Sequence, residues 1–137
     1  MPNYWLLKTE PSKYSFADLE REKRAVWDGV ANALALKHLR SMKRGDLAFI
    51  YHTGDEKQII GIAEVTSDPY PDPKQNDRKL VVVDLKYRER LPRPVTLAEI
   101  KAAREFQDFE LVRMGRLSVM PVSDSRWREL CKMASRR

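Results

Sequence analysis

The chain has 137 residues, 42% of them hydrophobic and 34% charged, which suits one globular domain over 1–137 with a core of its own. Its formal net charge of +6 favours polyanionic partners without requiring them. A lone cysteine excludes an intrachain disulfide, and no apolar run approaches the roughly 20 residues that span a bilayer. The N-terminus lacks the pattern of a signal peptide, so we expect a cytoplasmic protein without membrane contact.

Hydrophobic periodicity and capping residues predict alternating strands and helices along the chain. The expected strands lie at 3–8, 46–52, 59–66, 80–90 and 117–122, and the expected helices at 16–24, 30–42, 97–104 and 124–134. Ser15 with Asp18 and Thr96 with Glu99 have the spacing of capping boxes, which predicts where two of the helices begin. A strand that contains Pro121 is expected at a sheet edge.

Glycine and proline mark the expected irregular positions. Gly61 inside a predicted strand indicates a bulge or a close backbone approach. Residues 67–78 contain three prolines and predict one long loop, and Pro92 and Pro94 are expected to end the strand before them. Strands and helices in separate blocks favour an α+β class, with a curled or barrel-like sheet of five to six strands.

The sequence contains few groups of the kind that enzymes use. Its five glycines form neither a phosphate-binding loop nor a dinucleotide-binding fingerprint. His38, His52 and Cys131 lack metal-ligand spacing, and Cys131 falls on the apolar face of a predicted helix, where a buried, inert thiol is expected. Glu10 and Asp28 could act as paired carboxylates, but we prefer a turn residue and a helix-entry residue. We therefore expect no cofactor, no metal and no catalytic residue.

Six sequence pieces occur in register over nearly the whole chain. They are KTEP at 8–11, WDGVAN at 27–32, GDLAFIYH at 45–52, GIAEV at 61–65, PVTLAEIK at 94–101 and RLSVMPV at 116–122. Together they resemble the EVE domain family. The resemblance implies a PUA-like fold, similar to the YTH domains that grip a methylated adenine of RNA in an aromatic cage. It also implies a reader of modified bases, chiefly modified cytosines in DNA.

Ten residues in or near these pieces are candidates for contact with a base. They are Lys8, Thr9, Glu10, Trp27, Asp28, Asn32, Tyr51, His52, Arg116 and Ser118. Trp27 is the first candidate because an aromatic face stacks on any base, with about 1–3 kcal/mol per base. Core packing is the alternative for Trp27, and the resemblance to YTH domains favours a pocket wall. Lys8, Thr9 and Glu10 follow the first strand and would lie at the mouth of the pocket.

Several candidates also have a purely structural interpretation. The amide of Asn32 could read a base edge or bond to backbone at the start of a helix. Asp28 is better explained as a helix-entry cap, and Tyr51 could simply be half-buried. Arg116 could pair with a phosphate or with an internal carboxylate such as Glu10, and the residues alone do not decide between them.

Basic residues recur at helical spacing in the segment after Trp27. Lys37, Arg40 and Arg44 are three and four positions apart, which places them on one face of the helix predicted there. Such a stripe could contact nucleic-acid phosphates, although a solvated helix face is the commoner explanation.

The expected function is that of a monomeric, non-enzymatic module that binds nucleic acid carrying a modified base, DNA rather than RNA. Two alternatives remain: a reader of modified RNA, and an enzyme or sensor that acts on a free nucleoside or nucleobase. The second gains support from Ala31 and Ala33, because family members often carry an arginine and an aromatic residue at these positions.

Overall fold

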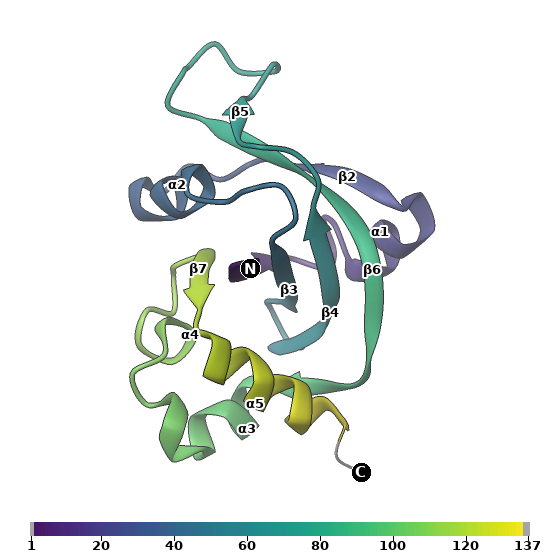
Figure 1. Ribbon diagram of the computed structural model, residues 1–137, viewed down its shortest axis with the longest axis vertical. Coiled ribbons are helices and arrows are strands. Elements are labelled where there is room, and N and C mark those ends of the chain that lie inside the picture. The colour runs from purple at the N-terminus through teal and green to yellow at the C-terminus, as the bar shows by residue number, and fades with distance from the viewer. Residues whose placement is uncertain (1, 136–137) are drawn as a thin grey trace.

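The computed structural model describes residues 2–135, which form a sheet with helices around it (Figure 1). The seven strands in this range are β1 (Tyr4–Thr9), β2 (Arg24–Trp27), β3 (Leu47–His52), β4 (Gln58–Val65), β5 (Tyr70–Pro71), β6 (Val81–Thr96) and β7 (Val119–Val122). The helices are α1 (Phe16–Glu22), α2 (Ala33–Arg40), α3 (Leu97–Ala102), α4 (Glu110–Arg113) and α5 (Asp124–Ser135), with a 3-10 turn, η1, at Arg104–Phe106.

The sheet is mixed and open. Its strand order is β2-β6-β4-β3-β1-β7, and β5 pairs with β6 beside this path. β1 and β3 run parallel, whereas the other pairs are antiparallel. The predicted α+β class and the edge position of the strand that contains Pro121 are confirmed. The sheet has more strands than expected because β2 and β5 were missed, and its path ends at β2 and β7 without closing into a barrel.

β2 begins at Arg24, the last residue of a predicted helix. The helix expected over 16–24 ends at Glu22, because Lys23 has a φ of +72° and its backbone N–H bonds to the carbonyl of Leu19. The chain then extends, and Arg24–Trp27 pairs with β6. Trp27 therefore ends a strand that the sequence did not predict.

The prediction that Pro92 and Pro94 end a strand was also wrong, since β6 continues through both. Between two paired positions, four residues of β6 (91–94) face a single residue of β4, Ile60. Prolines are tolerated at such a bulge because no ladder hydrogen bond needs their missing N–H groups.

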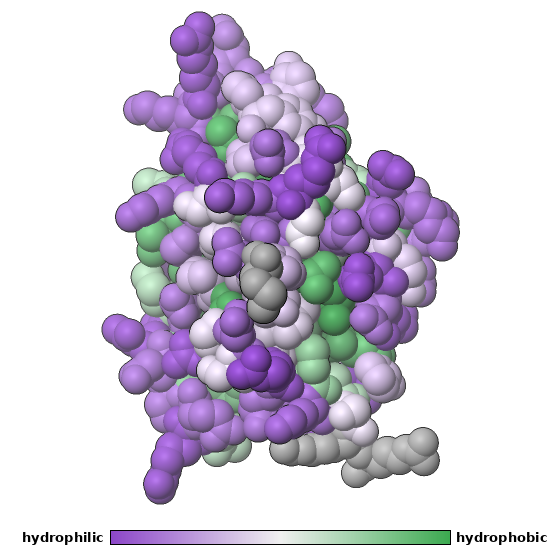
Figure 2. All heavy atoms as spheres, viewed as in Figure 1, coloured by the Kyte–Doolittle hydropathy of each residue, from purple (hydrophilic) through white to green (hydrophobic). Residues whose placement is uncertain are grey.

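Aromatic side chains join α5 to the sheet. The Trp127 ring of α5 stacks on Phe49 of β3 at 3.9 Å between ring centroids and on Tyr4 of β1 at 4.3 Å. The helix starts at Asp124, as its predicted range has it, and the Ser123 hydroxyl caps it by accepting the N–H of Arg126. The outer surface is mostly hydrophilic in the view of Figure 2, with smaller hydrophobic areas between. The buried hydrophobic side chains of the strands and helices form one core cluster.

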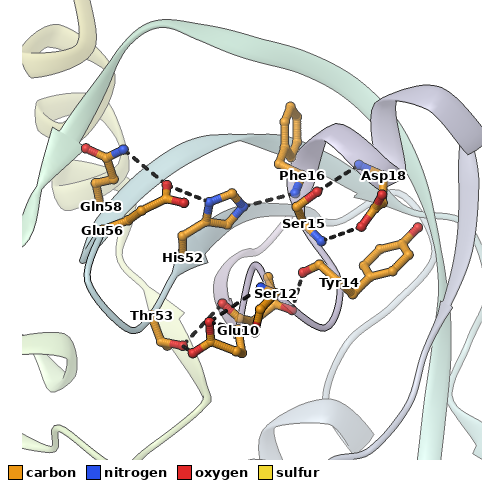
Figure 3. Close-up of polar contacts among 11 residues, drawn as sticks. Glu10, Ser12, Tyr14, Ser15, Phe16, Asp18, His52, Thr53, Glu56 and Gln58 are labelled. Carbon is orange, nitrogen blue, oxygen red and sulfur yellow. Dashed lines mark hydrogen bonds and ion pairs between the residues drawn. The ribbon is translucent and has the colours of Figure 1, made fainter.

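Phe16, the first residue of α1, is held through both its backbone and its ring. Its N–H donates to Nε2 of His52 at 3.0 Å, and Nδ1 of His52 lies 2.9 Å from a carboxylate oxygen of Glu56 (Figure 3). This bond lowers the pKa of the Glu56 carboxyl. The Phe16 ring lies so close to the backbone of Gly61 that a Cβ there would be 2.2 Å from the ring. The close approach predicted at Gly61 is confirmed.

Gly61→Ala is expected to lower the free energy of unfolding by about 1–3 kcal/mol, because the added methyl group must displace the buried Phe16 ring. Urea denaturation measures the change. Gly115→Ala is the matched control, since a Cβ at Gly115 meets nothing within 4 Å and is expected to change stability by less than about 0.5 kcal/mol. Equal stability of the two variants would contradict the packing described for Gly61.

His52→Leu is expected to lower the free energy of unfolding by about 1–3 kcal/mol, because it leaves the buried N–H of Phe16 without its acceptor. Glu56→Gln keeps an acceptor opposite Nδ1 and should stay within about 0.5 kcal/mol of the parent chain. Chemical denaturation of both variants compares them directly. If Glu56→Gln cost as much as His52→Leu, the bond to Phe16 would not be the stabilising contact.

Candidate functional site

A cavity of about 410 Å³ opens where β1 and β2 end. It is lined by Lys8, Thr9, Lys13, Tyr14, Val26, Trp27, Asp28, Gly29, Val30 and Ser118. We call it the Trp27 cavity. Its volume lies within the range of roughly 300–1,000 Å³ that is usual for small-ligand sites.

The lining residues come from four separate stretches of the chain, which are 8–9, 13–14, 26–30 and Ser118. Lys8 and Thr9 end β1, and the N–H of Lys8 donates to the carbonyl of Ser118 at 2.9 Å, so the segment before β7 lies beside them. Trp27 ends β2, and Gly29 then turns the chain with a φ of +80°, a conformation that favours glycine. The pairing of β1 with β7 and the turn after β2 therefore place these groups around one space.

Two aromatic rings form part of the wall. The rings of Trp27 and Tyr14 meet edge to face, 6.2 Å apart between centroids and 80° between planes. The hydroxyl of Thr9 donates to the carbonyl of Tyr14 at 2.7 Å, which fixes the backbone that carries the second ring. Trp27 is only 7% exposed, so it packs into the core and lines the cavity at once. Among the described residues, none accepts a hydrogen bond from its indole N–H.

The polar side chains that line the cavity include hydrogen-bond donors and one carboxylate, that of Asp28. The Lys8 ammonium donates to the carbonyl of Gly115 at 2.9 Å and lies 5.7 Å from the Tyr51 ring centroid. Its partial burial lowers the pKa of Lys8. In the described part of the chain, the side chains of Asp28 and Ser118 have no hydrogen-bond partner, so both can serve a ligand.

A second cavity, of about 470 Å³, lies next to the first. We call it the Arg116 cavity, and its lining residues are Asn32, Leu34, Arg113, Met114, Gly115, Arg116 and Leu117. Asn32 also caps α2, since its side-chain oxygen accepts the N–H of Ala35 at 3.0 Å. The helix therefore begins at Ala33 rather than at residue 30, and the prediction that Asp28 is the cap was wrong.

Three predicted site residues lie outside both cavities. The Glu10 carboxylate accepts from the hydroxyls of Ser12 and Thr53 near its own turn (Figure 3). Tyr51 is buried beneath Lys8, and burial raises the pKa of its phenol. His52 uses both ring nitrogens within the fold, as described above. A ligand role for these three remains a prediction, and the Trp27 cavity does not depend on them.

Only two of the three basic residues predicted to share one helix face lie on a helix. Lys37 and Arg40 are exposed on α2, but Arg44 lies beyond the end of that helix, in the turn before β3. The Arg40 guanidinium donates to the carbonyl of Lys79 at 2.7 Å and so ties α2 to the segment that extends from the body after β5 (Figure 1). The prediction that one helix face carries all three cations was wrong.

Sequence reasoning missed several lining residues. Tyr14 was missed because nothing in the local sequence indicates that its ring reaches Trp27. Lys13 lies in the same turn as Tyr14. Val26 was missed together with β2. Arg113 was missed because only the tertiary fold brings its segment to the same cavity as Asn32 and Leu34. Asp28 and Ser118, by contrast, were named in advance through the matched sequence pieces.

The described residues show no metal centre. Within 2–135, no group of three or more His, Cys, Asp and Glu side chains is placed to hold a metal ion. Over the same range, every helix is too short or too polar to cross a membrane.

Comparison with known proteins places this geometry in a family. The EVE domain family model matches residues 3–133. Mouse thymocyte nuclear protein 1 is 30% identical over 157 aligned positions, which cover 90% of this chain and 70% of the mouse protein. The NMR structure of a Rhodopseudomonas palustris protein is 42% identical with a TM-score of 0.91, covering 96% of this chain and 92% of that one.

A human relative is solved with a ligand. The crystal structure of human THYN1 protein in complex with DNA that contains 5-methylcytosine is 27% identical to this chain, with a TM-score of 0.90, and covers 98% of this chain and 99% of that one. These matches confirm the expected PUA-like α+β fold. The chain belongs to the EVE domain family, as its six sequence pieces predicted.

Proposed function

We propose that this chain is a binding module without catalytic activity, which takes a modified base of nucleic acid into the Trp27 cavity. A modified cytosine in DNA is the favoured ligand. The observation that carries the proposal is the cavity itself, where two aromatic rings meet at the ends of two strands beside unbonded polar groups. The human relative bound to DNA that contains 5-methylcytosine supports the choice of ligand.

The aromatic wall supplies affinity, and a methyl group on the base adds to it. Stacking on Trp27 would contribute about 1–3 kcal/mol for any base, so it cannot distinguish modified from unmodified cytosine. A buried methyl group adds about 0.8 kcal/mol, which is roughly a fourfold gain in affinity. A preference of several-fold for the methylated base is therefore what an apolar wall of this kind can deliver.

The polar groups supply the choice of base. Cytosine presents an exocyclic amine beside two acceptors, and the Asp28 carboxylate can accept from that amine. The Ser118 hydroxyl can donate to one of the acceptors. Thymine would place a carbonyl against Asp28, and a buried, unpaired polar group costs about 1–3 kcal/mol. The cavity thus fits the hydrogen-bonding edge of cytosine better than that of thymine.

Binding to duplex DNA carries an extra cost. A base inside a duplex must leave the stack before it enters a cavity, which costs a few kcal/mol, and less at a mismatch. Electrostatic attraction between DNA and a chain of net charge +6 offsets part of this cost. Single strands that carry the same modified base should therefore bind at least as tightly as duplexes.

Trp27→Ala is expected to abolish the preference for a modified base. Fluorescence anisotropy would compare single-stranded and duplex DNA that carry one cytosine, 5-methylcytosine, 5-hydroxymethylcytosine, 5-formylcytosine or N6-methyladenine, with an RNA strand in parallel. The parent chain should bind one modified cytosine several-fold more tightly than cytosine. Trp27→Ala should bind both equally, because it removes the wall that contacts the modification.

Trp27→Phe is the matched control, because it keeps an aromatic face and should retain part of the preference. Denaturation curves of both variants show whether each is folded at the assay temperature, which matters because Trp27 is nearly buried. A folded Trp27→Ala variant that keeps the parent chain's full preference for the modified base over cytosine would contradict the proposal.

A further inference from the structure

We propose that the Arg116 cavity binds a backbone phosphate next to the base held in the Trp27 cavity, so that the ligand is a nucleic-acid strand rather than a free base. The assignment of the base rests on the proposed function. The assignment of the phosphate rests on separate residues, Arg113, Arg116 and Asn32, which belong to the second cavity alone.

Consecutive parts of the same two segments line the two cavities. Residues 26–30 line the first cavity, and Asn32 and Leu34 continue the same segment into the second. On the opposite side, 113–117 line the second cavity and Ser118 lines the first. The Lys8 ammonium, on the first wall, donates to the carbonyl of Gly115, on the second. A strand whose base occupies the Trp27 cavity would therefore bring its neighbouring phosphate toward the Arg116 cavity.

The Arg116 cavity is built to receive an anion. Its seven described lining residues include two arginines and no acidic residue. Both arginines are exposed, and within the described chain neither guanidinium has a hydrogen-bond or ion-pair partner. The internal carboxylate considered for Arg116, that of Glu10, bonds to Ser12 and Thr53 instead. Two unpaired guanidinium groups on one cavity suit a phosphate, which each can contact through two parallel N–H groups.

Asn32 adds a neutral donor to this wall. Its side-chain oxygen is used by the N–H of Ala35, so the amide NH₂ group is the part that remains for a ligand. The cavity therefore offers donors from three side chains, whereas the neighbouring Trp27 cavity contains the acidic Asp28. This division matches the chemistry of a nucleotide, whose base has donors and acceptors and whose phosphate only accepts.

The test removes both cations and asks what kind of binding is lost. Arg113→Gln/Arg116→Gln would be compared with Arg104→Gln/Arg128→Gln, which removes the same charge from exposed arginines of η1 and α5. The probes are a single-stranded oligonucleotide with one 5-methylcytosine, its unmodified counterpart, and the free nucleoside 5-methyldeoxycytidine. Dissociation constants would be measured over a series of salt concentrations.

The variant in the Arg116 cavity should bind both oligonucleotides roughly tenfold or more weakly, by the same factor, because a phosphate carries no information about the base. The slope of log K against log salt should become shallower by about 0.7 for each lost phosphate contact. Affinity for the nucleoside and the ratio of methylated to unmodified affinity should not change. The control pair should retain most of the parent affinity and slope.

Unchanged oligonucleotide affinity and slope in Arg113→Gln/Arg116→Gln would overturn the inference, as would an equal loss in the control pair. Nucleoside binding as tight as oligonucleotide binding would overturn it too and would indicate a sensor of free nucleosides. Failure of the proposed function looks different, since the parent chain would then show no preference for the modified base. In that case the salt slopes on the unmodified strand still decide whether these arginines bind phosphate.

Discussion

The contact between Phe16 and the backbone of β4 is the constraint on which the candidate site depends. The ring leaves no room for a side chain at Gly61, and the N–H of the same residue is bonded to His52 at the end of β3. α1 is therefore fixed to two central strands at its first residue. The turn immediately before it carries Tyr14, whose ring meets Trp27. A shift of Phe16 would thus move one aromatic wall of the cavity against the other.

Local signals in the sequence predicted the fold well where the interactions are themselves local. Both capping boxes are present, and the strands β1, β3 and β4 lie close to their predicted ranges. β2 was missed because its extended conformation depends on pairing with β6, where Trp27 lies opposite Val83, far along the chain. The strand through Pro92 and Pro94 was missed for a related reason, since a bulge depends on the partner strand.

About half of the residues that line the Trp27 cavity could be predicted from the sequence. Resemblance to a family pointed to residues at the ends of strands, and five of the ten, Lys8, Thr9, Trp27, Asp28 and Ser118, line one cavity. Two others, Asn32 and Arg116, line the adjoining one. Tyr14 and Arg113 were out of reach, because turns and tertiary contacts that no short pattern encodes bring them there. The structure also shows how Asn32 is used within the fold. Its side-chain oxygen caps α2, and its amide NH₂ group stays free.

The position of Trp27 on β2 has a consequence for how the cavity adapts to its contents. In the described structure β2 has four residues and pairs with β6 alone, whereas β1 is hydrogen-bonded on both sides, to β3 and β7. Short edge strands open at lower free energy than central ones, so amide protons of β2 should exchange with solvent sooner than those of β1. The wall that β2 supplies is therefore expected to move more easily than the wall that β1 supplies. If the cavity binds a base as we propose, a larger substituent would be accommodated by displacement of the edge strand, while Lys8 and Thr9 would stay in place.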